Sequence, residues 1–136
     1  MNAYRAEVSL RIYHEDTDAG GVVYHANYLR YMERARTEWL QSTGFNHDRV
    51  AQELGVLFVV RQVDMKYLRP ARLGDDLVAR AELVGVRHGL MRFDQRVSCK
   101  EHVLVRAQVT VACVRLSDFT VAAIPATLLS VLGVEG

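Results

Sequence analysis

A carboxylate and an imidazole lie close together in a glycine-rich segment of the chain. Asp18 precedes Gly20 and Gly21, and His25 follows just before a stretch with helical periodicity. A carboxylate in such a turn can act as a general base on water or attack an acyl carbon directly. The N–H groups around Tyr24 and His25 lie at the positive end of the following helix, where they can hold an oxyanion. The segment therefore predicts a nucleophile or base beside an oxyanion hole.

The same residues also have structural interpretations. Asp18 followed by glycines is typical of an Asx turn, and both His25 and Asn27 are polar residues that can cap a helix. Glu33 and Arg36 have the spacing of an ion pair on a helix surface. From the turn alone, the structural and the chemical interpretations of Asp18 both remain open.

Composition and missing motifs exclude several other classes of function. With a net charge of +1 and 24% charged residues, the chain has no strong field for nucleic acid. It has no serine-hydrolase elbow, phosphate loop or dinucleotide fingerprint, and its five histidines lack metal-site spacing. No apolar run approaches a membrane span, and the first residues lack the apolar core of a secretion signal. We therefore expect a cytoplasmic protein with no metal, no nucleic-acid partner and no membrane insertion.

Hydrophobic periodicity predicts one long helix followed by sheet. Apolar residues from Tyr28 to Leu40 recur at helical spacing, which predicts a helix over residues 26–42 that ends before Gly44. A short helix is expected at 48–54, before Gly55, and a last one at 125–132. Alternation predicts the strands, which are expected at 8–13, 57–68, 77–86, 91–99 and 103–114.

Short links at residues 87–90 and 100–102 predict hairpins and antiparallel pairing. The strand at 57–68 is interrupted by Arg61, and its apolar residues are expected on one face: Leu57, Val59, Val63, Met65 and Tyr67. The alternation at 91–99 is broken only by Gln95. The hairpins place Cys99 and Cys113 apart, which predicts two reduced thiols. The fold class is α+β, one domain over residues 1–136, with an antiparallel sheet wrapped around a helix and its edges covered by dimerisation.

The motif resembles that of a known family. Thr-Asp-Ala-Gly-Gly-Val-Val-Tyr-His-Ala-Asn-Tyr-Leu at 17–29, followed by Glu-Arg-Ala-Arg at 33–36, resembles the signature of the 4-hydroxybenzoyl-CoA thioesterase family. Within this family it is most similar to the branch of acyl-CoA thioesterases associated with the Tol-Pal system. The resemblance implies the hotdog fold, in which a five-stranded antiparallel sheet wraps around a long helix. It also implies homodimers with joined sheets, or homotetramers, with active sites at the dimer interface.

The resemblance implies roles for individual residues. Asp18 matches the catalytic aspartate, and His25 matches the position whose N–H faces the thioester carbonyl and whose side chain takes part. His14 departs from the aromatic residue, usually tyrosine, expected there. The substrate-binding residues are expected to be Tyr13, His14, Gly21, Val22, Tyr24, Arg87 and His88. The candidates for the phosphates of coenzyme A are Arg61, Lys66, Arg69, Arg72, Arg87, His88 and Arg92.

The expected function is that of an acyl-CoA thioesterase acting on short- to medium-chain, or aromatic, acyl-CoA. Coenzyme A is then part of the substrate, and no cofactor is needed. One alternative is a hotdog dehydratase or hydratase that pairs His25 with Glu33, although the spacing of Asp18 and His25 favours the thioesterases. Another is a binding role, with acyl carrier protein as partner or as a scaffold of an envelope complex.

Overall fold

A five-stranded antiparallel sheet with the strand order β1-β3-β4-β5-β2 forms the body of the protein. The structure is a computed structural model that describes residues 5–133; residues 1–4, part of the segment tested for a secretion signal, lie outside them. The strands are β1 Arg5–Arg11, β2 Val56–Tyr67, β3 Asp76–Arg87, β4 Leu90–Cys99 and β5 His102–Arg115. The helices are α1 Asn27–Ser42, α2 His47–Leu54, α3 Ala126–Leu132 and the short 3-10 helix η1 His14–Asp16. The predicted strands, hairpins and long helix are confirmed.

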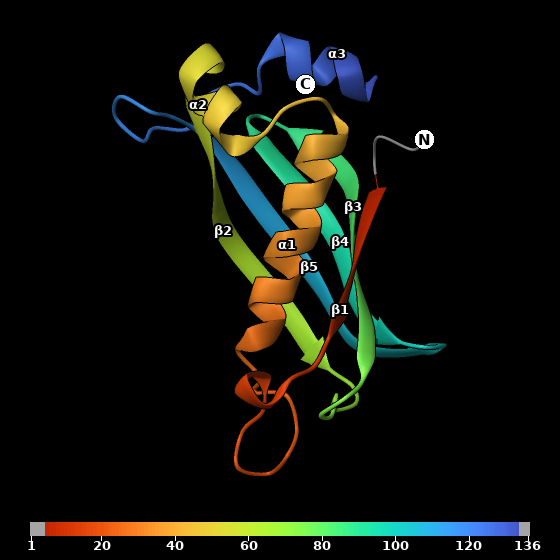
Figure 1. Ribbon diagram of the computed structural model, residues 1–136. Helices are drawn as coiled ribbons and strands as arrows, with labels where there is room; N and C mark the ends of the chain where they lie inside the picture. Colours follow the sequence, from red (N-terminus) through yellow and green to blue (C-terminus); the bar gives the residue numbers. More distant parts are fainter. Residues whose placement is uncertain (1–4, 134–136) are drawn as a thin grey trace.

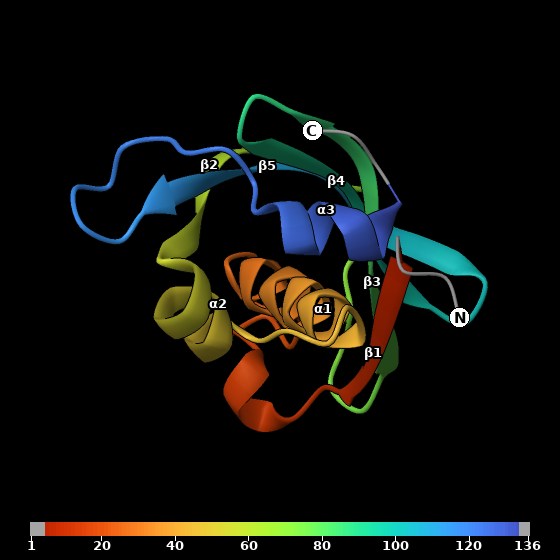
Figure 2. The same cartoon turned by 90° about the horizontal axis from the view of Figure 1, so that it is seen from above.

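Helix α1 lies in the concave face of the curved sheet (Figure 1, Figure 2). Its buried residues repeat every three or four positions and form one face: Tyr28, Tyr31, Met32, Ala35, Trp39 and Leu40. That face packs mainly on β1, β3 and β4, where the ring of Trp39 meets Phe93 edge-on at 4.9 Å. Most of the core therefore lies under one side of α1.

Local sequence sets the ends of the helices. Gly44, two residues after α1, has a φ of +91°, which glycine adopts without strain. The side chain of Asn46 accepts a hydrogen bond from the N–H of Arg49 at 2.8 Å and so caps α2. None of the helices within residues 5–133 is long and apolar enough to cross a membrane.

Strand β2 contains a bulge at Arg61, where the pairing with β5 passes from Val60 to Gln62. One extra residue reverses which side chains point to each face. The prediction that Leu57 and Val59 share a face with the later apolar residues is therefore wrong. After the bulge, the apolar residues of β2 lie opposite buried residues of β5, and these are Val63, Met65 and Tyr67.

The polar break in β4 has a structural explanation. Gln95 points into the core, where its Nε2 donates to the carbonyl of Met32 at 2.9 Å. Its Oε1 accepts from Nη1 of Arg36 at 2.8 Å. Burial lowers the pKa of the Arg36 guanidinium, and the nearby Glu33 raises it less. Gln95 thus satisfies both a helix carbonyl and a partly buried cation.

Helix α3 covers the end of the sheet at which β1 begins (Figure 2). Leu128 and Leu132 of α3 are buried in the core. In the same region the N–H of Cys113 donates to the carbonyl of Gly89 at 2.8 Å, as the predicted hairpin requires. Cys99 and Cys113 are both free thiols, which confirms the prediction.

Candidate functional site

The glycine-rich segment forms a closed loop between η1 and α1. The N–H of Asp18 donates to the carbonyl of Val22 at 2.9 Å, and Thr17 pairs with Val23 in an isolated bridge. The carboxylate oxygen Oδ1 of Asp18 accepts from the N–H of Gly20 at 2.8 Å, so the Asx turn is present. Within residues 5–133 the other carboxylate oxygen, Oδ2, accepts no hydrogen bond, and the side chain is exposed. Asp18 therefore has both a structural oxygen and a free one.

The connection between β2 and β3 holds this loop in place. The N–H of Val23 donates to the carbonyl of Ala71 at 2.8 Å, and Val22 forms a bridge with Arg72. The N–H of Ala71 in turn donates to the hydroxyl of Tyr28 at 3.1 Å. Gly21 has a φ of +79°, which allows the loop to turn back toward this connection. The position of Asp18 is thus set by residues about fifty positions later.

The carbonyl of Asp16 fixes the start of α1. It accepts hydrogen bonds from the N–H of Tyr24 at 3.0 Å and from Nδ2 of Asn27 at 2.9 Å. The Tyr24 N–H, predicted to hold an oxyanion with that of His25, is therefore occupied, and this part of the prediction is wrong. Within the described residues the N–H of His25 has no partner. Neither His25 nor Asn27 caps the helix through its side chain, because the N-cap is Ala26.

The ring of His25 lies between two tyrosines. Its centroid is 4.6 Å from that of Tyr24 and 6.3 Å from that of Tyr67. The hydroxyl of Tyr67 donates to the carbonyl of His25 at 3.1 Å. His25 and Tyr67 border a hollow of about 300 Å³. Its lining residues are Val23, His25, Tyr28, Tyr67, Leu68, Arg69 and Pro70. This role of Tyr67 was not predicted, because local alternation places Tyr67 only in a strand.

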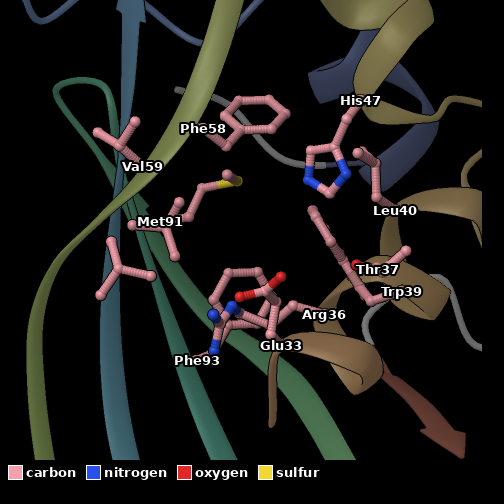
Figure 3. A pocket seen from close by; sticks show the side chains of 12 residues that line it. Glu33, Arg36, Thr37, Trp39, Leu40, His47, Phe58, Val59, Met91 and Phe93 are labelled. Atoms are coloured by element: carbon pink, nitrogen blue, oxygen red, sulfur yellow. The ribbon is translucent and has the colours of Figure 1, made fainter. Parts of the chain in front are cut away.

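A larger cavity of about 430 Å³ lies between α1, the start of α2 and the first half of β2 (Figure 3). Most of its walls are apolar. Its lining residues are Glu33, Arg36, Thr37, Trp39, Leu40, His47, Phe58, Val59, Val60, Met91, Phe93 and Val111. Glu33 and Arg36 bring the charges to this cavity, and Arg36 is held there by Gln95. Glu33 and His25, the pair expected in a dehydratase, line different cavities.

The remaining predicted residues fall into two groups. Tyr13 and His14 are exposed beside the loop, and Tyr24 is 48% exposed. Arg87 and His88 lie at the opposite end of the sheet. Asp76, the first residue of β3, pairs with Arg11, and Arg87 lies eleven residues further along the strand. The eleven steps amount to about 36 Å. Within one chain, these two residues are not brought to Asp18.

Other cations do lie near the loop. Arg69 belongs both to the hollow beside His25 and to a neighbouring hollow of about 460 Å³. Arg72, Lys100 and His102 also line the second hollow. Lys100 and His102 come from the hairpin between β4 and β5, and their sequence positions alone did not place them here.

The sequence pattern of the thioesterase superfamily matches residues 20–106. An acyl-CoA thioesterase, YbgC, from Haemophilus influenzae is 41% identical over 116 residues, which cover 85% of each chain. An acyl-CoA thioester hydrolase, YbgC, from Escherichia coli is 44% identical over 115 residues, covering 84% of this chain and 85% of the relative.

Solved structures give the same picture of the fold. A probable thioesterase from Bartonella henselae superposes with a TM-score of 0.84 at 31% identity, covering 89% of this chain and 99% of that one. A 1,4-dihydroxy-2-naphthoyl-CoA thioesterase from Synechocystis superposes with a TM-score of 0.85 at 22% identity, covering 95% and 96%. At that identity the second likeness concerns the fold alone. The curved five-stranded sheet around α1 is the hotdog fold.

Proposed function

Since the chain belongs to the thioesterase superfamily, we propose that it hydrolyses the thioester bond of acyl-CoA substrates to a free acid and coenzyme A. The relatives that support this proposal are the YbgC thioesterases of H. influenzae and E. coli, which align with more than four fifths of the chain. The acyl groups we expect are short to medium in length, or aromatic.

One observation carries the proposal: the loop presents a free carboxylate oxygen and a free amide a few residues apart. Oδ1 of Asp18 is held by the N–H of Gly20, while Oδ2 has no partner within residues 5–133. The N–H of His25, two residues before the start of α1, is also unpartnered there. A preorganised acceptor and a preorganised donor are the two parts that attack on a thioester carbonyl requires.

In the proposed reaction, Oδ2 of Asp18 attacks the carbonyl carbon itself or removes a proton from an attacking water molecule. Negative charge then develops on the carbonyl oxygen, and the His25 N–H donates to it with the support of the α1 dipole. The carbon–sulfur bond breaks and coenzyme A leaves as the thiolate. In the first route, water then hydrolyses the anhydride formed with Asp18. The His25 ring, packed on Tyr24 and Tyr67, orients the substrate.

We further propose that a homodimer forms through β2, an edge strand of the sheet. β2 exposes apolar side chains: Val59 at 37%, Val60 at 48%, Val63 at 37% and Tyr67 at 50%. An edge with unpaired backbone groups and apolar residues favours pairing with a second strand. The cavity between α1 and β2 opens beside this edge and would take the acyl group.

The phosphates of coenzyme A need a cationic surface near the thioester. Within one protomer we assign this role to Arg69 and Arg72, since Arg69 borders the His25 hollow and Arg72 bridges to Val22. Arg87 and His88 would contribute only to a site that a partner copy completes.

The test is release of free thiol from acetyl-, butyryl-, hexanoyl-, palmitoyl- and benzoyl-CoA by the wild type and by Asp18→Asn. The asparagine amide oxygen still accepts from Gly20, so the turn is retained, but it neither attacks nor takes a proton. We expect turnover to fall at least about 100-fold, the scale of a lost general base, with an unchanged circular dichroism spectrum. The matched control is Glu15→Gln, an exposed carboxylate of the same segment, which should retain wild-type turnover. If Asp18→Asn and Glu15→Gln are equally active, Asp18 is only a turn residue.

A further inference from the structure

The cavity between α1 and β2 contains one guanidinium group among mostly apolar walls. Eight of the twelve residues that line it are apolar. Arg36 reaches into it from α1 and is only partly exposed. In Figure 3, Arg36 and Glu33 lie at the end of the cavity beside Phe93, and His47 lies at the opposite end. The cavity therefore has a cationic end and a long apolar remainder.

The chain satisfies this guanidinium only in part. Nη1 of Arg36 donates to Oε1 of Gln95 at 2.8 Å, and that acceptor is a neutral amide. Within residues 5–133, Arg36 has no other side-chain hydrogen bond and no ion pair. A guanidinium has five N–H donors, and a partly buried cation with only a neutral partner keeps its desolvation cost. Most of the donors of Arg36 are thus available to a ligand.

The carboxylate nearest to Arg36 does not complete the pair. Glu33 is the one acidic residue among those that line the cavity, and its side chain is exposed. Its charge raises the pKa of Arg36 less than burial lowers it. The two residues form no ion pair in the part of the chain that the structure describes. The position of an anion beside Arg36 is therefore left to a bound molecule.

The same two elements lead from the proposed reaction site to this cavity. Tyr28 of α1 and Tyr67 of β2 border the hollow beside His25, and further along the same helix and strand lie the walls of the cavity. Between them are two exposed apolar residues, Leu29 on α1 and Val63 on β2. Leu29 is four residues before Glu33, so both lie on the same face of the helix. An acyl chain can therefore lie along α1 from the loop to Arg36.

The position of Arg36 on α1 sets the length of such a chain. Arg36 is nine residues after Asn27, the first residue of the helix, which corresponds to about 14 Å along the axis. Helical side chains lean toward the N-terminus, so the guanidinium is several ångströms closer to the loop. Carbon–carbon bonds are about 1.5 Å long, and a zigzag chain of roughly eight carbons spans about 10 Å. A medium-length acyl group thus ends near Arg36.

We propose that the preferred substrates carry a second carboxylate at the far end of the acyl group, and that Arg36 binds it. These substrates are the coenzyme A monothioesters of linear dicarboxylic acids. A planar guanidinium matches a carboxylate with two parallel hydrogen bonds, which are stronger than bonds between neutral groups. Arg36 is then a specificity-determining residue. The proposal rests on the proposed thioesterase function, because it assigns the acyl group of that reaction.

The test compares thioesters that differ only in the last carbon of the acyl group. The pairs are hexanoyl- and adipyl-CoA, octanoyl- and suberyl-CoA, and decanoyl- and sebacyl-CoA. Wild-type kcat/KM for suberyl-CoA should exceed that for octanoyl-CoA at least about 10-fold, the scale of a hydrogen bond to a charged group. The ratio should be smaller for the hexanoyl and adipyl pair, because the shorter chain does not reach Arg36.

Variants of the two charged residues identify the cause of the preference. Arg36→Met removes the charge and keeps an apolar side chain, so the ratio of suberyl- to octanoyl-CoA should fall to about one or below. Arg36→Lys retains the charge and should retain part of the preference. Glu33→Gln removes a like charge beside the incoming carboxylate and should raise the ratio. The control is Arg34→Met, whose guanidinium lies 5.8 Å from the Tyr31 ring centroid and outside the cavity lining, and it should keep the wild-type ratio.

The results separate this proposal from the proposed function. If octanoyl-CoA is hydrolysed at least as well as suberyl-CoA, or if Arg36→Met keeps the preference, the role of Arg36 is wrong while the thioesterase function stands. If none of the six thioesters is hydrolysed, both proposals are wrong. Glu33→Gln changes an exposed residue and leaves the contact of Arg36 with Gln95 intact. It therefore gives a result even where Arg36→Met does not fold, and an unchanged ratio in it would contradict the proposal.

Discussion

The two halves of the sheet differ in how they are covered. The strands β1, β3 and β4 lie under α1, and residues such as Met91, Phe93 and Val97 are at most 1% exposed. Strand β2 packs mainly on β5 and α2 and leaves apolar side chains such as Val60 partly exposed. The larger cavity and the hollow beside His25 both lie on the β2 side of α1. The molecule thus separates a half that provides stability from a half that is open to substrate and partner.

The largest difference between the halves is expected when one apolar side chain in each half is truncated to alanine. Phe93→Ala removes the ring that meets Trp39 at 4.9 Å, and such a core cavity costs about 3–5 kcal/mol of unfolding free energy. Val60→Ala, on the open half, should cost less than about 1 kcal/mol. Urea denaturation of both variants measures the two costs. Equal losses would show that the open half supports the fold as much as the covered half does.

A smaller effect is expected at the polar contact inside the covered half. Gln95→Leu leaves the Met32 carbonyl and the Arg36 guanidinium without their Gln95 bonds, which costs about 1–3 kcal/mol. Gln52→Leu changes the same residue type on the exposed side of α2 and should be nearly neutral. A Gln95→Leu protein as stable as the wild type in the same denaturation experiment would contradict this role for Gln95.

On the open half, Tyr67→Phe removes only the hydroxyl that donates to the His25 carbonyl. The expected loss of stability is about 0.5–1.5 kcal/mol, with a decrease in thioester turnover because His25 is less well held. Tyr24→Phe is the control, because the Tyr24 ring also packs on His25 but its hydroxyl donates no hydrogen bond within residues 5–133. Turnover that responds equally to both changes would remove Tyr67 from the site.

The smallest effect at neutral pH concerns a thiol. Burial raises the pKa of Cys113 from 9.0 to about 11. Between these two values the folded state binds more protons than the unfolded state, so stability should fall as pH rises through that range. Cys113→Ala should flatten this decline in stability, measured as the melting temperature between pH 8 and pH 11.

The two thiols should also differ in reactivity. At pH 8, iodoacetamide should modify the half-buried Cys99 before the buried Cys113. Faster modification of Cys113 would contradict its burial.

Local patterns predicted the elements better than their contacts. The helix expected at 26–42 is found at Asn27–Ser42, because helical periodicity is a property of neighbouring residues. The single polar break at Gln95 also correctly marked an unusual position. By contrast, the role of Tyr67 beside His25 depends on residues 42 positions apart, and no local pattern specifies such a distance.

The site was predicted only in part, because some of its features depend on neighbouring residues and others on contacts between distant ones. The Asx turn at Asp18 follows from a side chain and an amide two residues apart. The loss of the Tyr24 amide to the Asp16 carbonyl follows from the way the loop closes. The separation of Arg87 from Asp18 follows from strand pairing, since β3 carries Arg87 to the far end of the sheet.

The sequence by itself determined the positions of the elements, the turn that holds Asp18 and the alternation of apolar and polar residues along each strand. These depend on interactions over one to four residues, which composition and spacing describe. Only the tertiary structure decided which strand β2 pairs with, where its bulge falls, and which residues of the connection between β2 and β3 hold the loop of Asp18. Register and packing are set by contacts between residues distant in the chain, so they exist only once the sheet has closed around α1.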